Sequence, residues 1–202
     1  MTTQAFVVDT GAANFASVCA CLRRLGVEPV FAHTPLQIES AELLVLPGVG
    51  AFESAMKRLH ELELEEPLAR RIEAGKPTLA ICLGLQLLCE ASEEGDGVRG
   101  LGVLPTTIRR FDDTQPVPQL GWNEIEPLEA CEFLQPGWAV FANSYYLAEI
   151  PEGWSGAYTD YSTRFVSAVE RGGVLACQFH PELSGDWGHE LIARWIEKAK
   201  VA

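Results

Sequence analysis

Up to about residue 90, apolar runs of strand length alternate with amphipathic helical stretches, and this alternation limits the folds open to the chain. Strands are predicted over 6–9, 29–31, 43–46 and 78–82, and helices over 15–25, from 35 onward and across most of 52–74. The run 43–46 is apolar at every position, as in a strand buried on both faces. The pattern predicts an α/β fold, an open and mostly parallel twisted sheet with helices on both faces.

The C-terminal half of the chain has a different pattern. Short β-rich runs at 106–108, 122–125, 139–141 and 166–169 are separated by prolines and glycines, and an amphipathic helix follows them near residue 191. The pattern contains no linker and no second helix-rich region. We therefore expect mixed or antiparallel strands that extend the same sheet. A length of 202 residues suits one domain, over 1–202.

The composition argues against several classes of protein. A formal net charge of −13 repels phosphate backbones and anionic membranes, so neither nucleic acid nor a membrane is expected as a partner. The N-terminus lacks the basic region of a signal peptide, and no apolar run approaches the roughly 20 residues of a membrane span. The six cysteines have neither CxxC spacing nor a disulfide framework. We expect reduced thiols in a cytoplasmic protein that uses no metal and no other cofactor.

One cysteine stands apart from the others because of its position. Cys82 ends an apolar strand, Gly84 follows, and a helix-forming stretch runs over 85–90. A sharp strand-to-helix turn exposes its central residue and points the free N–H groups of the helix toward it. A helix N-terminus stabilises negative charge, so the thiol there ionises more readily and can act as a nucleophile. Cys19, Cys89 and Cys177 lie inside apolar patterns and are expected to be small buried hydrophobic residues.

A second strand, predicted from residue 174 onward, leads to a histidine and a carboxylate. His180 is followed by Pro181 and Glu182. A carboxylate that binds one ring nitrogen fixes the histidine tautomer and stabilises the imidazolium, while the other nitrogen serves the nucleophile. In a parallel sheet, Cys82 and His180 would both lie at the carboxyl edge, where such folds bind their ligands. The sequence therefore predicts a nucleophile, a base and an orienting acid.

The glycine-rich segment 47–50 also follows a predicted strand and reaches the same edge. On its own it is typical of an ordinary turn. Beside a nucleophile, however, its exposed N–H groups suit a tetrahedral oxyanion. We expect one donor from Val49 or Gly50 and one from Leu83, the residue after the cysteine.

Segments 82–86 and 180–182 resemble the motifs of the class I, cysteine-triad glutamine amidotransferases. Further segments narrow the resemblance to the glutaminase subunits of imidazole glycerol phosphate synthase. These are 9–17 with Gly11 and Asn14, 46–52, 121–123, 144–145 and 178–182. The resemblance extends from about residue 5 to residue 197.

The resemblance implies that Cys82 attacks the side-chain amide of L-glutamine and that His180 protonates the departing ammonia. It also implies a substrate pocket formed by Gly50, Gln86, Asn143, Ser144 and Tyr145. The ammonia would pass to a cyclase subunit with a (β/α)₈ barrel fold, which forms a heterodimer with the glutaminase and makes imidazole glycerol phosphate. Asn14, Gln119, Trp122 and Leu183 are expected at the partner interface.

The chain departs from the family pattern at four places. Ala80 stands where glycine is usual, Asn143 where histidine is usual, and Leu183 where lysine or arginine is usual. Gln119 and Leu120 replace a usual His-Met pair. None of these positions belongs to the predicted triad, and Leu183 and Gln119 are expected to lie toward the partner, where they bear on coupling between the subunits.

Two other functions fit parts of the sequence. A glutaminase of pyridoxal phosphate synthase would share the chemistry, and His-Pro-Glu-Leu at 180–183 would suit it, whereas segments 48–52 and 121–123 argue against it. A non-catalytic paralogue that only binds a partner is the other alternative. The presence of all three triad residues argues against that alternative.

Overall fold

The computed structural model describes residues 3–11, 14–95 and 97–200, so Ala12 and Ala13 of the family-like segment 9–17 lie outside the described residues. Its centre is a nine-stranded sheet with the order β2-β1-β3-β4-β12-β11-β10-β7-β8. The strands are β1 (Gln4–Val8), β2 (Glu28–Ala32), β3 (Leu43–Gly48), β4 (Thr78–Cys82), β7 (Gln119–Pro127), β8 (Gly137–Asn143), β10 (Ser155–Asp160), β11 (Arg164–Arg171) and β12 (Val174–Cys177).

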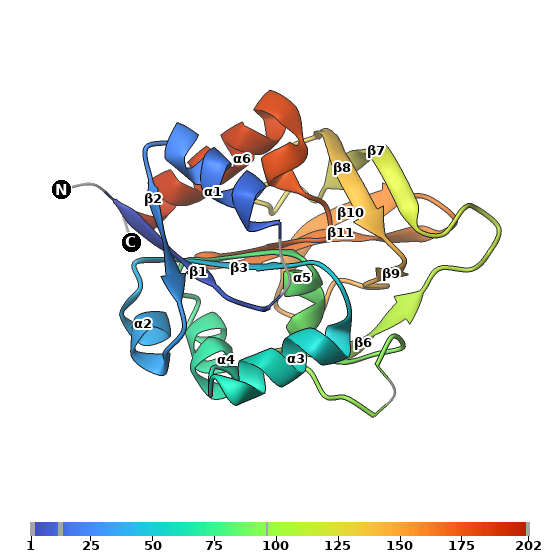
Figure 1. Cartoon of the computed structure of the whole chain (residues 1–202). Helices are drawn as coiled ribbons and strands as arrows, with labels where there is room; N and C mark the ends of the chain where they lie inside the picture. Colours follow the sequence, from blue (N-terminus) through green and yellow to red (C-terminus); the bar gives the residue numbers. More distant parts are fainter. Residues whose placement is uncertain (1–2, 12–13, 96, 201–202) are drawn as a thin grey trace.

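Helices cover both faces of the sheet, as the sequence pattern predicts (Figure 1). They are α1 (Phe15–Arg24), α2 (Pro35–Ser40), α3 (Phe52–Glu61), α4 (Glu65–Glu73), α5 (Leu83–Leu87), α6 (Gly185–Ala199) and the short 3₁₀ helix η1 (Pro181–Leu183). Helices α1 and α6 lie on one face, and α2, α3, α4 and α5 lie on the other. Among the described residues, no helix is both long and apolar enough to cross a bilayer.

Two apolar cores form because side chains alternate between the faces of each buried strand. In β3, Leu44 and Leu46 pack into the core beneath α2, α3 and α4. Leu43 and Val45 pack into the opposite core, which contains Leu22 of α1 and residues of α6 such as Leu191 and Trp195. A strand that serves both cores has to be apolar throughout, which explains the unbroken run 43–46.

The parallel half of the sheet brings together three strand ends that matter for the site. Gly48 at the end of β3 is paired with Cys82 at the end of β4. On the other side of β4, Cys177 at the end of β12 is paired with Ile81. The carboxyl ends of β3, β4 and β12 therefore lie side by side, and the segments that follow them meet at one edge.

The C-terminal half extends the sheet with antiparallel strands, as expected, but it does not place every strand there. Strands β11, β10, β7 and β8 continue the large sheet beyond β12. Strand β6 (Leu104–Arg110) instead joins a separate three-stranded sheet with β5 (Cys89–Ser92) and β9 (Tyr145–Tyr146). The small sheet adds a wall beside the carboxyl edge of the large one, next to α5 (Figure 1).

The prediction of one helix over 85–90 is wrong in its extent. Helix α5 starts directly after Cys82 and stops at Leu87, and Cys89 already belongs to β5. Residues 83–89 are all buried, so their apolar character carries no helical period that could mark an end. The helix stops because the chain turns back to pair with β6, where Cys89 lies opposite Leu104.

Candidate active site

Cys82 occupies a strained turn between β4 and α5. Its backbone has φ 55° and ψ −110°, a conformation that costs a non-glycine residue on the order of 1–3 kcal/mol. Gly84 makes this turn possible, because a Cβ at that position would overlap the carbonyl oxygen of Leu46 in β3. The sequence prediction of a sharp strand-to-helix turn with its glycine two residues on is confirmed in its geometry.

His180 and Glu182 are held together at the neighbouring strand end. Nδ1 of His180 lies 2.9 Å from Oε1 of Glu182, and both side chains are buried. Burial alone would lower the pKa of His180, but hydrogen bonds and charge interactions with Cys82 and Glu182 outweigh it and raise the pKa to about 10. The imidazole therefore lies between a sulfur and a carboxylate that both favour its protonated form.

The main chain around His180 is anchored to strand β8. The N–H of His180 donates to the carbonyl of Val140 at 2.9 Å. The Ser184 hydroxyl donates to the His180 carbonyl at 2.6 Å and accepts from the Val140 N–H at 3.0 Å. Ser184 is 1% exposed. Sequence patterns give no signal for its role, because its contact with Val140 joins residues far apart in the chain.

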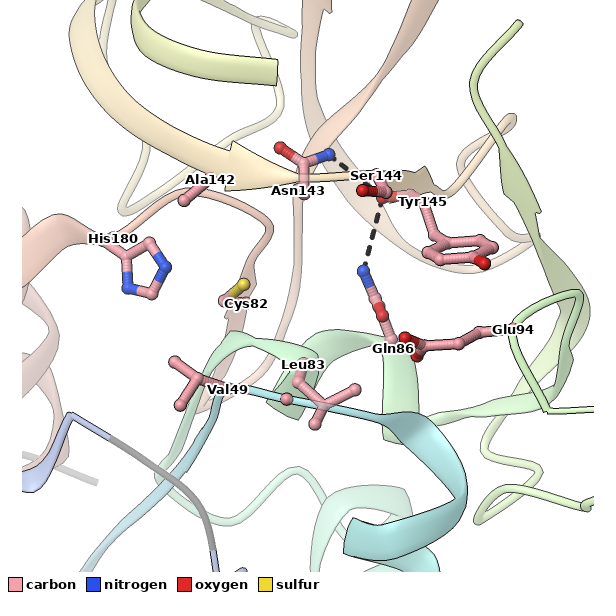
Figure 2. Close-up of a pocket in the computed structure, with 11 residues that line it drawn as sticks. Val49, Cys82, Leu83, Gln86, Glu94, Ala142, Asn143, Ser144, Tyr145 and His180 are labelled. Atoms are coloured by element: carbon pink, nitrogen blue, oxygen red, sulfur yellow. Dashed lines mark hydrogen bonds between the residues drawn. The ribbon is translucent and has the colours of Figure 1, made fainter. Parts of the chain in front are cut away.

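A cavity of about 290 Å³ opens beside Cys82 and His180 (Figure 2). It is lined by the residues that the sequence predicts for the oxyanion hole and by those that the resemblance assigns to the substrate pocket, namely Val49, Gly50, Leu83, Gln86, Asn143, Ser144 and Tyr145. Glu182 is not part of the lining and lies behind the imidazole, bonded to Nδ1. The structure thus brings the predicted site residues to one place at the carboxyl edge of the sheet.

Glu94 also lines this cavity, and sequence reasoning missed it. It follows β5 in a polar turn that carries no motif, so only the fold brings it to the site. Its Oε2 accepts a hydrogen bond from the N–H of Phe52, at the start of α3, at 2.9 Å. Among the described residues that line the cavity, Glu94 is the one with a carboxylate.

Gln86 projects from α5 into the same region and is 5% exposed. Its Nε2 donates to the carbonyl of Tyr145 at 3.3 Å and to Oε1 of Gln178 at 3.0 Å. Gln178 in turn directs its Nε2 toward the Cys82 sulfur, 3.7 Å away. The segment 178–182 carries part of the family resemblance, but the sequence predicts no role for Gln178.

The remaining cysteines differ from Cys82 in their surroundings. Cys19, Cys89 and Cys177 are buried in the apolar cores, as predicted, and all six thiols are free. Burial raises the pKa of the thiols of Cys89 and Cys177, with nearby carboxylates acting in the same direction. Among the described residues, no group of histidine, cysteine and acidic side chains could hold a metal ion.

The four residues expected at the partner interface have different surroundings. Trp122 is 54% exposed and Leu183 is 42% exposed, and Asn14 caps the N-terminus of α1 on the surface. Gln119 is fully buried and donates to Asn123, so its side chain does not reach the surface. Because side chains alternate along β7, the neighbouring Leu120 is the exposed one, at 72%. The expectation that the Gln119 side chain lies at the partner interface is therefore wrong, and Leu120 is the exposed residue at this place.

Comparisons with known proteins agree with this geometry. The family model for class I glutamine amidotransferases matches residues 6–199. The protein "Imidazole glycerol phosphate synthase subunit HisH" of Symbiobacterium thermophilum is 39% identical, over 94% of this chain and 91% of that protein. The subunit of the same name from Methanothermobacter thermautotrophicus is 38% identical, over 95% of this chain and 96% of that protein.

A longer plant protein and a solved structure extend the comparison. "Imidazole glycerol phosphate synthase hisHF, chloroplastic" of Arabidopsis thaliana is 39% identical over 94% of this chain, which matches 33% of that protein. A crystal structure titled as a glutamine amidotransferase superposes with a TM-score of 0.77 at 24% identity, over 96% of this chain and 98% of that one. At that identity the likeness supports the fold alone.

The named relatives favour imidazole glycerol phosphate synthase over the pyridoxal phosphate synthase alternative. Their identities and coverage extend over nearly the whole chain. The chain therefore belongs to the class I glutamine amidotransferase family of enzymes and, within it, to the HisH subunits of imidazole glycerol phosphate synthase.

Proposed function

We propose that Cys82, His180 and Glu182 form the catalytic triad of a glutaminase. The observation that carries this proposal is the cavity at the carboxyl edge of the sheet, where a cysteine in a strained turn meets an imidazole that is bonded to a buried carboxylate. The Cys82 sulfur attacks the side-chain amide carbon of L-glutamine. The tetrahedral intermediate then expels ammonia, which takes a proton from His180, and leaves a thioester. His180 next accepts a proton from water, which attacks the thioester and releases glutamate.

The oxyanion of both tetrahedral intermediates needs fixed donors. The N–H of Leu83 lies at the start of α5, where the helix end favours negative charge. A second donor would come from Val49 or Gly50, which line the cavity after β3. Gly50 has φ +93°, so another residue there would be strained and would move this segment. Loss of one such donor typically lowers the rate by about 10²–10³-fold.

Glutamine carries an α-ammonium group and an α-carboxylate, and the cavity offers partners for both. Glu94 supplies the negative charge that the ammonium requires. The backbone of Asn143, Ser144 and Tyr145, together with Gly50, lines the same cavity and would meet the α-carboxylate. Gln86 contributes its Oε1, because both of its N–H groups are used within the protein.

The Glu94→Gln substitution tests this recognition. It removes the charge but keeps a carbonyl oxygen for the Phe52 N–H, so the fold should remain intact. The loss of a charge-assisted hydrogen bond should raise KM for glutamine by about 10–100-fold. Steady-state glutaminase kinetics would measure this change. A matched control is Glu93→Gln on the neighbouring position, which does not line the cavity and should leave KM unchanged.

We also propose a heterodimer with a cyclase subunit whose fold is a (β/α)₈ barrel, and a place in histidine biosynthesis. The fused plant relative supports a glutaminase and a second unit that work together. The exposed apolar residues Leu120, Trp122 and Leu183 would lie at this contact. Direct transfer of ammonia has a chemical reason, since ammonia released into water near neutral pH is protonated and is no longer a nucleophile.

The broader organisation fits this function. The large sheet takes strands from both halves of the chain, which supports the assignment of 1–202 to one domain. Six free thiols suit a reducing compartment, and we propose the cytoplasm.

The function is tested by a glutaminase assay with and without the purified cyclase and its nucleotide substrate. We expect glutamate and ammonia from glutamine, and a glutamine-mimicking electrophile should label Cys82. If the electrophile failed to label Cys82 even with the cyclase bound, the chain would be a non-catalytic binding paralogue. If a pyridoxal phosphate synthase subunit activated the glutaminase and the cyclase did not, the cyclase would not be the partner that receives the ammonia.

A further inference from the structure

Gln178 is a completely buried amide next to the nucleophile. It lies between β12 and His180 and is 0% exposed. Its Nε2 lies 3.7 Å from the Cys82 sulfur, and its Oε1 accepts from Nε2 of Gln86 at 3.0 Å. Its backbone N–H donates to the carbonyl of Ser167 in β11 at 2.8 Å, which fixes the start of the side chain. A buried amide with this set of partners has little freedom to reorient.

The Tyr145 carbonyl determines which group donates and which accepts in the hydrogen bonds that link Gln86, Gln178 and Cys82. The carbonyl oxygen of Tyr145 can only accept, so the nearest group of Gln86 must be its NH₂. The second N–H of that NH₂ requires an acceptor, which places Oε1 of Gln178 toward Gln86. The remaining end of Gln178 is then an NH₂, and it points to the Cys82 sulfur. A backbone carbonyl thus determines which atom of Gln178 faces the nucleophile.

This order of donors and acceptors has two effects on the reaction. An N–H directed at sulfur binds a thiolate more strongly than a neutral thiol, because hydrogen bonds to charged groups are the stronger ones. The same arrangement of donors and acceptors uses both N–H groups of the Gln86 side chain within the protein. Its Oε1 therefore remains available to the substrate. Figure 2 shows Gln86 with its nitrogen directed to the Tyr145 carbonyl.

We propose that Gln178 is a positioning residue that stabilises the Cys82 thiolate through Nε2 and fixes the orientation of Gln86 for glutamine through Oε1. This inference rests on the proposed function, in which Cys82 is the nucleophile and Gln86 contacts the substrate. Other charged groups also face this region. They are His180 with Glu182 behind it, and Glu94 across the cavity. Gln178 acts beside them as a neutral donor inside the protein.

Two substitutions separate the two effects. Gln178→Met keeps the length of the side chain but removes both the donor and the acceptor. It should shift the midpoint of the pH profile of Cys82 alkylation upward by about one pH unit and raise KM for glutamine by about tenfold. Gln178→Glu keeps an acceptor for Gln86 but puts a carboxyl group against the sulfur. It should shift the midpoint at least as far, while KM stays near the wild-type value.

The measurement is iodoacetamide alkylation of the full chain over a range of pH, with the modified cysteine identified by mass spectrometry. Steady-state kinetics of the complex with the cyclase give KM and kcat. Thr159→Val is the matched control, because Thr159 is 1% exposed and donates to the Glu124 carbonyl without touching Cys82. It should lower thermal stability as any lost buried hydrogen bond does, with no change in the alkylation midpoint.

The outcomes distinguish this inference from the proposed function. Folded Gln178 variants with the wild-type alkylation midpoint and KM would overturn the role of Gln178, and so would an equal midpoint shift in Thr159→Val. In both cases, labelling of wild-type Cys82 by the glutamine-mimicking electrophile would leave the glutaminase assignment intact. Absence of that labelling in the wild type would instead overturn the proposed function and this inference with it.

Discussion

Replacing Cys82 by alanine should abolish glutamine-dependent synthesis by the assembled enzyme and leave ammonia-dependent synthesis unchanged. Among the described residues that line the cavity, no other has a thiol that can form the thioester, so kcat/KM for glutamine should fall by a factor on the order of 10⁶, to the background. Added ammonium salt bypasses the glutaminase and supplies the partner directly. The measurement is product formation by the complex with each nitrogen source in turn.

The matched control for this variant is Cys89→Ala. Cys89 is a completely buried thiol of β5 that lies in the apolar core and does not line the cavity. Its loss should cost some stability but leave glutamine-dependent synthesis in place. A Cys82→Ala enzyme that still used glutamine would rule out Cys82 as the nucleophile.

The second large effect is expected for Glu182→Gln. Oε1 of Glu182 is bonded to Nδ1 of His180, and the carboxylate stabilises the imidazolium. A neutral amide keeps the size of the side chain but removes the charge. It can also hold the ring in the wrong tautomer. By comparison with other triads, kcat should fall by about 10²–10⁴-fold with the fold intact. Kinetics and circular dichroism of the same samples would test both parts.

The same variant should change the ionisation of His180 in a defined direction. Burial lowers the pKa of His180, whereas Cys82 and Glu182 raise it, to about 10 in the wild type. Removing the carboxylate takes away one of the two groups that oppose the effect of burial, so the pKa of His180 should fall below its wild-type value of about 10, while Cys82 still raises it. NMR of ¹⁵N-labelled histidine would follow this titration.

A second buried glutamate provides the control for both measurements. Glu170 is 5% exposed and accepts from the backbone N–H groups of residues 132–134 rather than from a histidine. Glu170→Gln should leave the titration of His180 where it is. If Glu182→Gln turned over glutamine at the wild-type rate, Glu182 would not belong to the triad.

Local patterns were sufficient to predict the parallel half of the fold and the setting of Cys82. The unbroken apolar run 43–46 is typical of a strand buried on both faces, and a glycine two residues after Cys82 marks the turn. The sequence also led to His180 and Glu182, because a strand and a proline define their surroundings. These features depend on neighbours in the chain, so a sequence can reveal them.

Other features depend on contacts between segments that are distant in the chain, and the local sequence pattern does not predict them. Glu94 reaches the cavity because β5 pairs with β6, and Gln178 reaches Cys82 because β12 lies beside β4. The inward position of Gln119 was unexpected for a related reason. Strand faces are predicted by assuming that apolar side chains face the core and polar ones face solvent. In β7 the order is reversed, because Gln119 is buried and Leu120 is exposed. The end of α5 was missed because residues 83–89 are buried on every side.

Strand β8 is the last strand of the large sheet, and one of its edges would otherwise be open. The segment that carries His180 covers part of that edge through Val140, with help from the Ser184 hydroxyl. Open strand edges recruit other chains and lead to aggregation. A substitution that detaches this segment would therefore do more than inactivate the enzyme. It would also expose a template for intermolecular pairing, so catalytic competence and resistance to aggregation depend on the same few hydrogen bonds.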